Sequence, residues 1–225
     1  GKIAIKSKVP LKTRHDLALA YTPGVGQVSL EIARDKSLVR TYTSKSNSVA
    51  VVTDGSSILG LGNLGPEAAL PVMEGKAVLF KKFADIDAFP ICLGTQDAEE
   101  IIKAVTYLAP GFGGINLEDI AAPKCFEVER RLIEALDIPV MHDDQRGTAT
   151  VVLAALLNAL KVRGLGKDAH IVINGAGAAG TAVANLLLRY GFVDLIVCDS
   201  KGILHSKRGD LNEGKLLLAQ RTNCN

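Results

Sequence analysis

The 225-residue sequence has no long apolar run, no strong excess of one charge and no tryptophan. No apolar stretch approaches the roughly 20 residues of a membrane-spanning helix, and no basic segment followed by an apolar core marks a secretory signal. We therefore expect a cytoplasmic protein without membrane contacts. The 26 lysines and arginines against 24 aspartates and glutamates give a net charge of +2, which predicts that nucleic acid is not a partner.

Closely spaced cysteines are also absent. The four cysteines, Cys92, Cys125, Cys198 and Cys224, lie far apart and show no Cys-x-x-Cys pattern. Because disulfide frameworks and zinc sites need patterned spacing, we predict free thiols. Hydrophobic residues make up 48% of the chain, which is enough to bury a core, and the length favours one or two domains.

Strand-like and helix-like patterns alternate along the chain, which is typical of an α/β fold with parallel strands. The expected strands lie near residues 49–53, 89–93, 114–117, 138–141, 170–174 and 195–199. The expected helices lie near residues 67–83, 97–109, 124–136, 148–160 and 181–190. The largely apolar helix over 148–160 is the candidate connector between two domains. We place the first domain at residues 1–163 and the second at 164–225.

Two acidic pairs follow successive strands. Glu118 and Asp119 come after one strand, and Asp143 and Asp144 follow the next, directly after His142. In a right-handed βαβ unit both pairs lie at the carboxyl ends of parallel strands, where α/β sheets bind their ligands. An all-oxygen cluster suits Mg²⁺ or Mn²⁺; the alternative is that some of these acids cap helices or remain solvated. His142 is interpreted as a structural residue beside the acids.

The second half of the chain contains a glycine pattern in the order strand, Gly-x-Gly-x-x-Gly, helix, strand, acid. This order is typical of a dinucleotide site, in which the helix N-terminus binds a pyrophosphate and the acid binds a ribose. The expected cofactor contacts are Gly175, Gly177, Ala178, Ala179, Gly180, Asp199 and Lys201. Asp199 favours NAD, whereas Lys201 would pair with the extra phosphate of NADP, so both stay open. The same glycine pattern at 60–65 does not directly follow a strand and is not expected to bind a dinucleotide.

Eight motifs, in order along the chain, make the sequence resemble the malic enzymes of the smaller bacterial or archaeal type. The motifs are YTPGV (21–25), TDG (53–55), GLGNLGPE (60–67), PVMEGK (71–76), FADID (83–87), GINLED (114–119), HDDQ (142–145) and GAGAAG (175–180). The resemblance implies a substrate and metal domain followed by part of a Rossmann domain. It also implies oxidative decarboxylation of L-malate to pyruvate and CO₂, with reduction of NAD or NADP and with Mg²⁺ or Mn²⁺ as the metal.

The resemblance assigns roles to particular residues. Lys76 matches the general base that takes the C2 hydroxyl proton, and Tyr21 matches the acid that protonates C3. Asp143 matches an adjacent carboxylate that tunes Lys76 or orients the substrate. The matched metal ligands are Glu118, Asp119 and Asp144. By residue type alone, Lys76 would extend from a buried helix to solvent and Tyr21 would be a core aromatic.

The sequence departs from the family at two points. Larger eukaryotic-type members carry an arginine in the loop where this chain has Ser56 and Ser57. The segment after His170 holds one strand–helix–strand unit and a tail, so we expect a C-terminally truncated Rossmann domain. Two alternatives follow: a malolactic reaction that releases lactate, and a fragment that binds metal or mediates assembly without turnover. We expect a homo-oligomer, a dimer.

Overall fold

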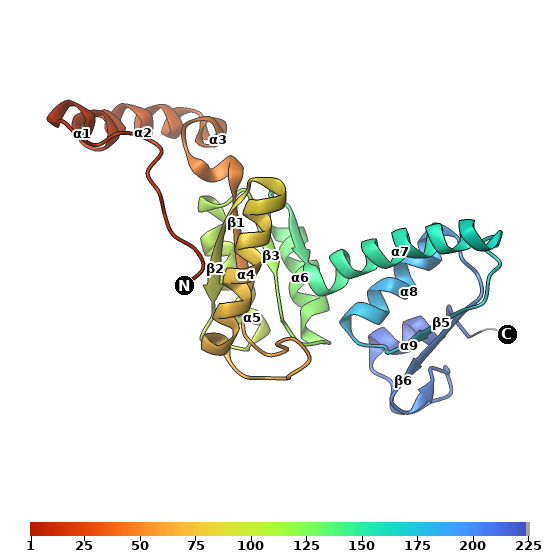
Figure 1. The fold of residues 1–225 in the computed structure, drawn as a ribbon. Coiled ribbons are helices and arrows are strands. Elements are labelled where there is room, and N and C mark those ends of the chain that lie inside the picture. Colours follow the sequence, from red (N-terminus) through yellow and green to blue (C-terminus); the bar gives the residue numbers. More distant parts are fainter. Residues whose placement is uncertain (224–225) are drawn as a thin grey trace.

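A four-stranded parallel sheet forms the centre of the first lobe of the computed structural model, which describes residues 1–223 (Figure 1). The strands follow the order β2-β1-β3-β4. They are β1 (Ser48–Thr53), β2 (Asp87–Cys92), β3 (Gly114–Leu117) and β4 (Val140–His142). Ala50, Val51 and Val52 are fully buried, because a central parallel strand is covered on both faces. The predicted α/β fold is confirmed.

Helices α4 (Pro66–Ala84), α5 (Ala98–Leu108) and α6 (Lys124–Ala135) cover this sheet. Helix α4 packs against β1 and β2 and buries Met73 and Ala77. Helices α5 and α6 pack side by side, and Val105 and Leu132 share a core with Val52 of the sheet. The apolar faces of α5 and α6 therefore share one core with the sheet, and α4 buries its own apolar residues separately against β1 and β2.

The chain before β1 forms an arm of short helices. They are α1 (Arg14–Ala20), α2 (Gly24–Arg34) and α3 (Val39–Tyr42). Short 3-10 turns occupy Lys36–Leu38 and Ser44–Asn47 in this arm, and a third such turn, Ala109–Gly111, follows α5. Thr13 and Asp16 form a capping box that begins α1, but none of the residues in the three helices is buried. Figure 1 shows α1 and α2 extending away from the sheet.

Helix α7 (Asp143–Arg163) leads from the first sheet into the second lobe (Figure 1). This lobe contains β5 (Ile171–Asn174), α8 (Ala178–Tyr190), β6 (Leu195–Asp199), β7 (Gly202–Ile203) and α9 (Glu213–Ala219). Strands β5 and β6 are parallel and β7 is antiparallel to β6. Along its length α7 packs on α8, where Ala149 and Leu160 share a core with Leu187. The helix expected over 148–160 is therefore longer and starts directly after β4.

The described residues bear on two features that the sequence lacks, paired cysteines and long apolar helices. Cys92, Cys125 and Cys198 are free thiols, in agreement with the prediction; Cys224 lies outside the described residues. Within residues 1–223, none of the helices combines the length and the apolar character that crossing a membrane requires.

Candidate active site

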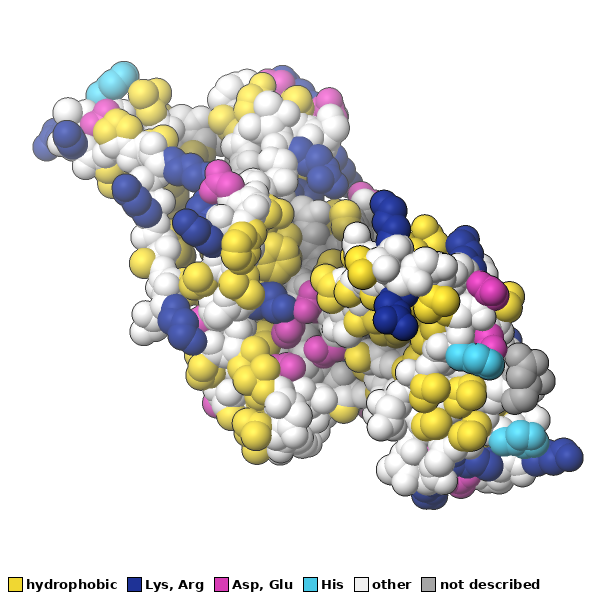
Figure 2. Space-filling model, turned by 45° about the vertical axis from the view of Figure 1, so that its right-hand side comes forward, with side chains coloured by type: hydrophobic (Ala, Val, Ile, Leu, Met, Phe, Trp, Pro, Cys, Tyr) yellow, Lys and Arg dark blue, Asp and Glu magenta, His cyan; other side chains and the backbone are white. Residues whose placement is uncertain are grey.

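Three carboxylates meet at the carboxyl edge of the first sheet. Glu118 and Asp119 directly follow β3, and Asp144 lies in the first turn of α7 directly after β4. Because β3 and β4 are parallel neighbours, with Leu117 opposite His142, the two acidic segments come together. One ligand atom from each of the three acids lies within 4.8 Å of the others. Figure 2 shows acidic side chains grouped in a recess between the lobes.

The carboxylate cluster carries negative charge that the protein compensates only in part. Burial raises the pKa of Glu118 to about 7, against the opposing effect of Lys76. Burial, with the charge of Asp144 in addition, raises the pKa of Asp119 to about 6. Asp119 Oδ2 is buried and has no hydrogen-bond partner among the described residues. An orphaned oxygen in an all-carboxylate set fits a hard divalent cation.

Lys76 projects from α4 into this acidic group. Its Nζ lies 2.7 Å from Asp143 Oδ2 and 3.1 Å from Glu118 Oε1, and its side chain is 20% exposed. Partial burial lowers the pKa of Lys76, but the hydrogen bond to Asp143 and the charge of Glu118 outweigh this effect and raise it. Burial alone would lower the pKa of Lys76, but in this site the net shift of the pKa is upward. An open cavity of about 670 Å³ borders Lys76 and Glu118.

Gly147 explains how Asp143 can reach Lys76. It lies inside α7, one turn after Asp143. A Cβ added at this position would lie 2.6 Å from Asp143 Oδ1, which is closer than a non-bonded carbon and oxygen approach. The missing side chain therefore leaves the space that the Asp143 carboxylate occupies. The sequence offers no signal for this contact, because Gly147 lies just before the helix expected over 148–160.

His142 lies beneath the cluster and is fully buried. Its Nε2 is 3.8 Å from Asp144 Oδ2, and burial lowers the pKa of the imidazole against the attraction of that carboxylate. Burial therefore favours the neutral imidazole, and the structural role of His142 stays a prediction.

Tyr21 is not part of this assembly within one chain. It ends α1, and its side chain is 64% exposed. Among the described residues, no hydrogen bond of its hydroxyl group is present, and Figure 1 shows α1 far from the carboxyl edge of the sheet. The proton donor expected beside Lys76 is thus absent from the site that a single chain forms.

The predicted glycine motif joins β5 to α8. Gly177 is the N-cap of α8, so Ala178 and Ala179 occupy its first turn with Gly180. Only glycine fits at position 180, because an added Cβ would lie 1.7 Å from the carbonyl oxygen of Gly175. The free amides of this first turn offer an anion site.

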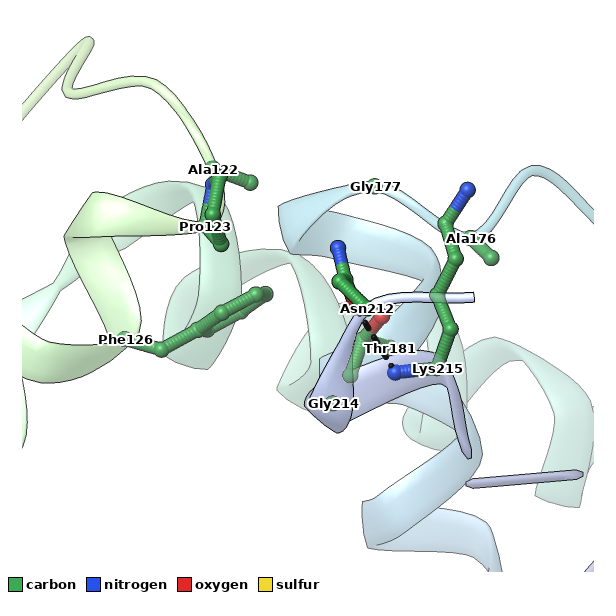
Figure 3. Close-up of a pocket in the computed structure, with 9 residues that line it drawn as sticks. All are labelled: Ala122, Pro123, Phe126, Ala176, Gly177, Thr181, Asn212, Gly214 and Lys215. Carbon is green, nitrogen blue, oxygen red and sulfur yellow. Dashed lines mark hydrogen bonds between the residues drawn. The ribbon is translucent and has the colours of Figure 1, made fainter. Parts of the chain in front are cut away.

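A cavity of about 220 Å³ separates the lobes beside this turn. Figure 3 shows Phe126 of α6 on the side of the first lobe, and Gly177, Thr181 and Lys215 on the side of the second. Asn212, before α9, completes this wall. The sequence offered no signal for Phe126, Asn212 or Lys215, because they come from segments outside the glycine motif.

Asp199 ends β6 as predicted, but basic side chains already surround it. Its two oxygens pair with Arg208 Nη1 at 3.0 Å and with Lys215 Nζ at 2.8 Å. These contacts hold the pKa of Asp199 well below its ordinary value. Lys201 donates only its backbone N–H to Asp199, while its Nζ pairs with Asp210 at 2.9 Å. The side-chain charge of Lys201 is thus paired with Asp210, and the positive charges beside Asp199 come from Arg208 and Lys215.

Two family models match the chain. The model for the malic enzyme N-terminal domain matches residues 1–99 and 94–133, and the model for the malic enzyme NAD binding domain matches residues 145–224. A bifunctional malic/malolactic enzyme of Bacillus subtilis is 55% identical over 99% of this chain and 55% of its own length. An NADP-dependent malic enzyme of Halomonas elongata is 50% identical over 97% of this chain and 53% of its own length.

A solved structure is similar to this chain at about the same level of identity as these relatives. The NAD-dependent malic enzyme of Thermotoga maritima superposes with a TM-score of 0.94 at 53% identity, over 99% of this chain and 62% of that chain. The present chain therefore spans only about half the length of the curated relatives that it matches.

Proposed function

The chain belongs to the malic enzyme family, and from this membership we propose that it forms part of an enzyme that oxidatively decarboxylates L-malate to pyruvate and CO₂ with reduction of NAD or NADP. The observation that carries the proposal is the position of Lys76, whose Nζ lies between Asp143 and Glu118 beside the carboxylate cluster. Lys76, Glu118, Asp119 and the glycine motif lie in segments that the family models cover, and Asp143 and Asp144 lie just before the second matched segment.

The residues of the site would bind the cation and transfer the proton separately. Glu118, Asp119 and Asp144 would hold Mg²⁺ or Mn²⁺, and Lys76 takes the proton of the C2 hydroxyl group. When bound, the cation would polarise the C2 oxygen and the nicotinamide would accept hydride. A cation bound to Glu118 would compensate its negative charge, and the attraction that raises the pKa of Lys76 would weaken. Burial, which lowers the pKa of Lys76, would remain. This change brings the lysine closer to a working base.

The test is an assay of the full-length protein with L-malate, Mn²⁺ and either NAD or NADP. We expect equal amounts of pyruvate and reduced cofactor. A malolactic reaction, which the bifunctional Bacillus subtilis relative favours as the second candidate, would release lactate without accumulation of reduced cofactor. Absence of all these products from a folded, Mn²⁺-binding full-length protein would contradict both functions.

Either cofactor is compatible with the surroundings of Asp199. Its carboxylate would accept hydrogen bonds from a ribose diol, and Arg208 and Lys215 beside it would pair with a 2′-phosphate. The separate NAD and NADP arms of the assay decide between them.

We predict that Gly147→Ala stabilises the fold and impairs the reaction. Alanine should add up to about 1 kcal/mol of helix stability, but its Cβ would displace the Asp143 carboxylate and release Lys76. A misplaced catalytic group costs about 10²-fold in rate. Thermal unfolding should therefore give a higher Tm than wild type, while kcat falls.

The control for this prediction is Asn158→Ala, which raises helix propensity at an exposed position of the same helix α7. It reports the effect of helix propensity on Tm without any change near Lys76. Unchanged kcat in Gly147→Ala would show that the contact between Asp143 and Lys76 does not serve the reaction.

We further propose a homodimer in which Tyr21 of one copy completes the site of the other. The arm supports this because Leu19, Tyr21 and Leu30 are each more than half exposed, and such apolar surface is typical of an interface. Full-length Lys76→Ala and Tyr21→Phe chains should each be inactive. When they are co-expressed, about half of the dimers should be mixed, and each mixed dimer contains one intact site of two, so the whole preparation should regain about a quarter of wild-type activity.

The double variant Tyr21→Phe, Lys76→Ala, co-expressed with either single variant, serves as the control and should remain inactive. If co-expression of the two single variants restores nothing although mixed dimers form, the two residues act within one chain.

A further inference from the structure

Ser56 lies in the loop where larger members of the family carry an arginine, yet its hydroxyl group does not point to solvent. Ser56 Oγ donates to Asp54 Oδ1 at 2.6 Å and accepts from the backbone N–H of Ala121 at 2.9 Å. The backbone N–H of Ser56 also donates to Asp54 Oδ1, at 3.0 Å. The hydroxyl group therefore donates its single proton and accepts one hydrogen bond inside the protein.

These contacts hold the loop that carries Asp119 from both sides. The carbonyl oxygen of Asp119 accepts from the backbone N–H of Ser57 at 3.0 Å, and Ala121, two residues later, donates to Ser56 Oγ. Asp119 itself has a φ of 53°, a left-handed conformation that L residues seldom adopt and that surrounding contacts must maintain. The hydrogen bonds from the 56–57 segment are such contacts.

The acceptor of Ser56 is itself immobile. Asp54 is fully buried at the end of β1, and its Oδ2 forms an ion pair with Lys124 of α6. Lys124 Nζ also donates to the carbonyl oxygen of Gln96 at 2.8 Å. A buried charge fixed by an ion pair and by hydrogen bonds is a rigid support for the groups bound to it.

We propose that Ser56 is a positioning residue that keeps Asp119 in the carboxylate cluster by linking the 119–121 loop to buried Asp54. The proposal rests on the proposed function, in which this cluster holds a divalent cation. The single proton of the Ser56 hydroxyl group is already donated to Asp54, so it is not available to donate to a substrate carboxylate. Groups that orient metal ligands contribute about 10- to 100-fold to metal affinity.

The test compares Mn²⁺ affinity in the full-length protein, measured from the electron paramagnetic resonance signal of free Mn²⁺. Ser56→Ala should raise the Kd by about 10-fold or more. The matched control is Ser57→Ala, because the Ser57 hydroxyl makes no hydrogen bond within residues 1–223 and its backbone N–H is retained. Ser56→Thr keeps a hydroxyl group and should restore most of the affinity.

Two further readouts separate positioning from general destabilisation. The apparent KM for Mn²⁺ of Ser56→Ala should rise, while kcat at saturating Mn²⁺ stays within a few-fold of wild type. If Ser56→Ala does not fold, Ser56→Cys, which offers a weaker donor and acceptor, should bind Mn²⁺ less tightly than Ser56→Thr. Equal Kd values for wild type and the folded Ser56 variants would overturn the positioning role, and failure of wild type to bind Mn²⁺ would overturn the metal site itself.

Discussion

Lys76→Ala in the full-length protein should lower malate-dependent formation of reduced cofactor by about 10³-fold, which is typical for the loss of a general base. Lys76 Nζ lies between Asp143 and Glu118 at 2.7 and 3.1 Å, and alanine leaves no basic group there. Mn²⁺ binding should be retained, because the removed group is a cation that competes for Glu118. Steady-state kinetics and a parallel Mn²⁺ titration measure the two effects.

Two comparisons make this prediction specific. Lys76→Arg keeps the positive charge but cannot lose its proton at neutral pH, so it should be as inactive as alanine if the residue is a base. Lys81→Ala removes another lysine of α4 that pairs with Asp85 and Asp87 at the surface, and it should leave kcat unchanged. Substantial activity in Lys76→Arg would show that charge, not proton transfer, is what the position supplies.

Asp119→Asn should weaken Mn²⁺ binding by about 10²-fold, because ligand charge sets the affinity of hard cations. The same substitution should increase the thermal stability of the metal-free protein. The pKa of Asp119 is raised from its ordinary 3.8 to about 6, so its contribution to stability is full below about pH 4 and is lost as pH rises through about 6. At pH 8 the substitution removes a destabilising charge, and the metal-free Tm should rise.

The measurement is thermal unfolding at pH 8 with and without Mn²⁺. Wild type should gain stability from Mn²⁺, whereas Asp119→Asn should start higher and gain little. Asp85→Asn is the matched control: Asp85 has the same φ of 53° but lies at the exposed end of α4. It should respond to Mn²⁺ as wild type does. A wild-type response in Asp119→Asn would remove this residue from the ligand set.

Local patterns were sufficient to predict most elements. The helix expected over 67–83 is α4, and the strand–helix–strand unit expected over 114–141 is β3, α6 and β4. Parallel topology also predicted that the two acidic pairs would approach one another. The helix expected over 148–160 begins too late, because Asp143 and Asp144, which follow β4, already form the first turn of α7. Acidic residues are favourable there, so the same residues suited both descriptions.

Contacts between distant segments could not be predicted from these patterns. The pKa of Lys76 rises because Asp143 and Glu118 reach it, although burial alone favoured a fall. The basic partners of Asp199 come from a loop and from α9. Tyr21, matched to the active site by its motif, lies in an arm that stands apart from the sheet.

The sequence by itself determined the α/β alternation, because side-chain periodicity and the steric demands of glycine act over a few residues. The resemblance of its eight ordered motifs indicated the family and the residues with chemical roles. Only the tertiary structure decided the ion pairs of Lys76, the orientation of Ser56 toward Asp54 and the separation of Tyr21 from the site. These properties depend on distances of a few ångströms between residues far apart in the chain, and electrostatic and hydrogen-bond energies change steeply over such distances.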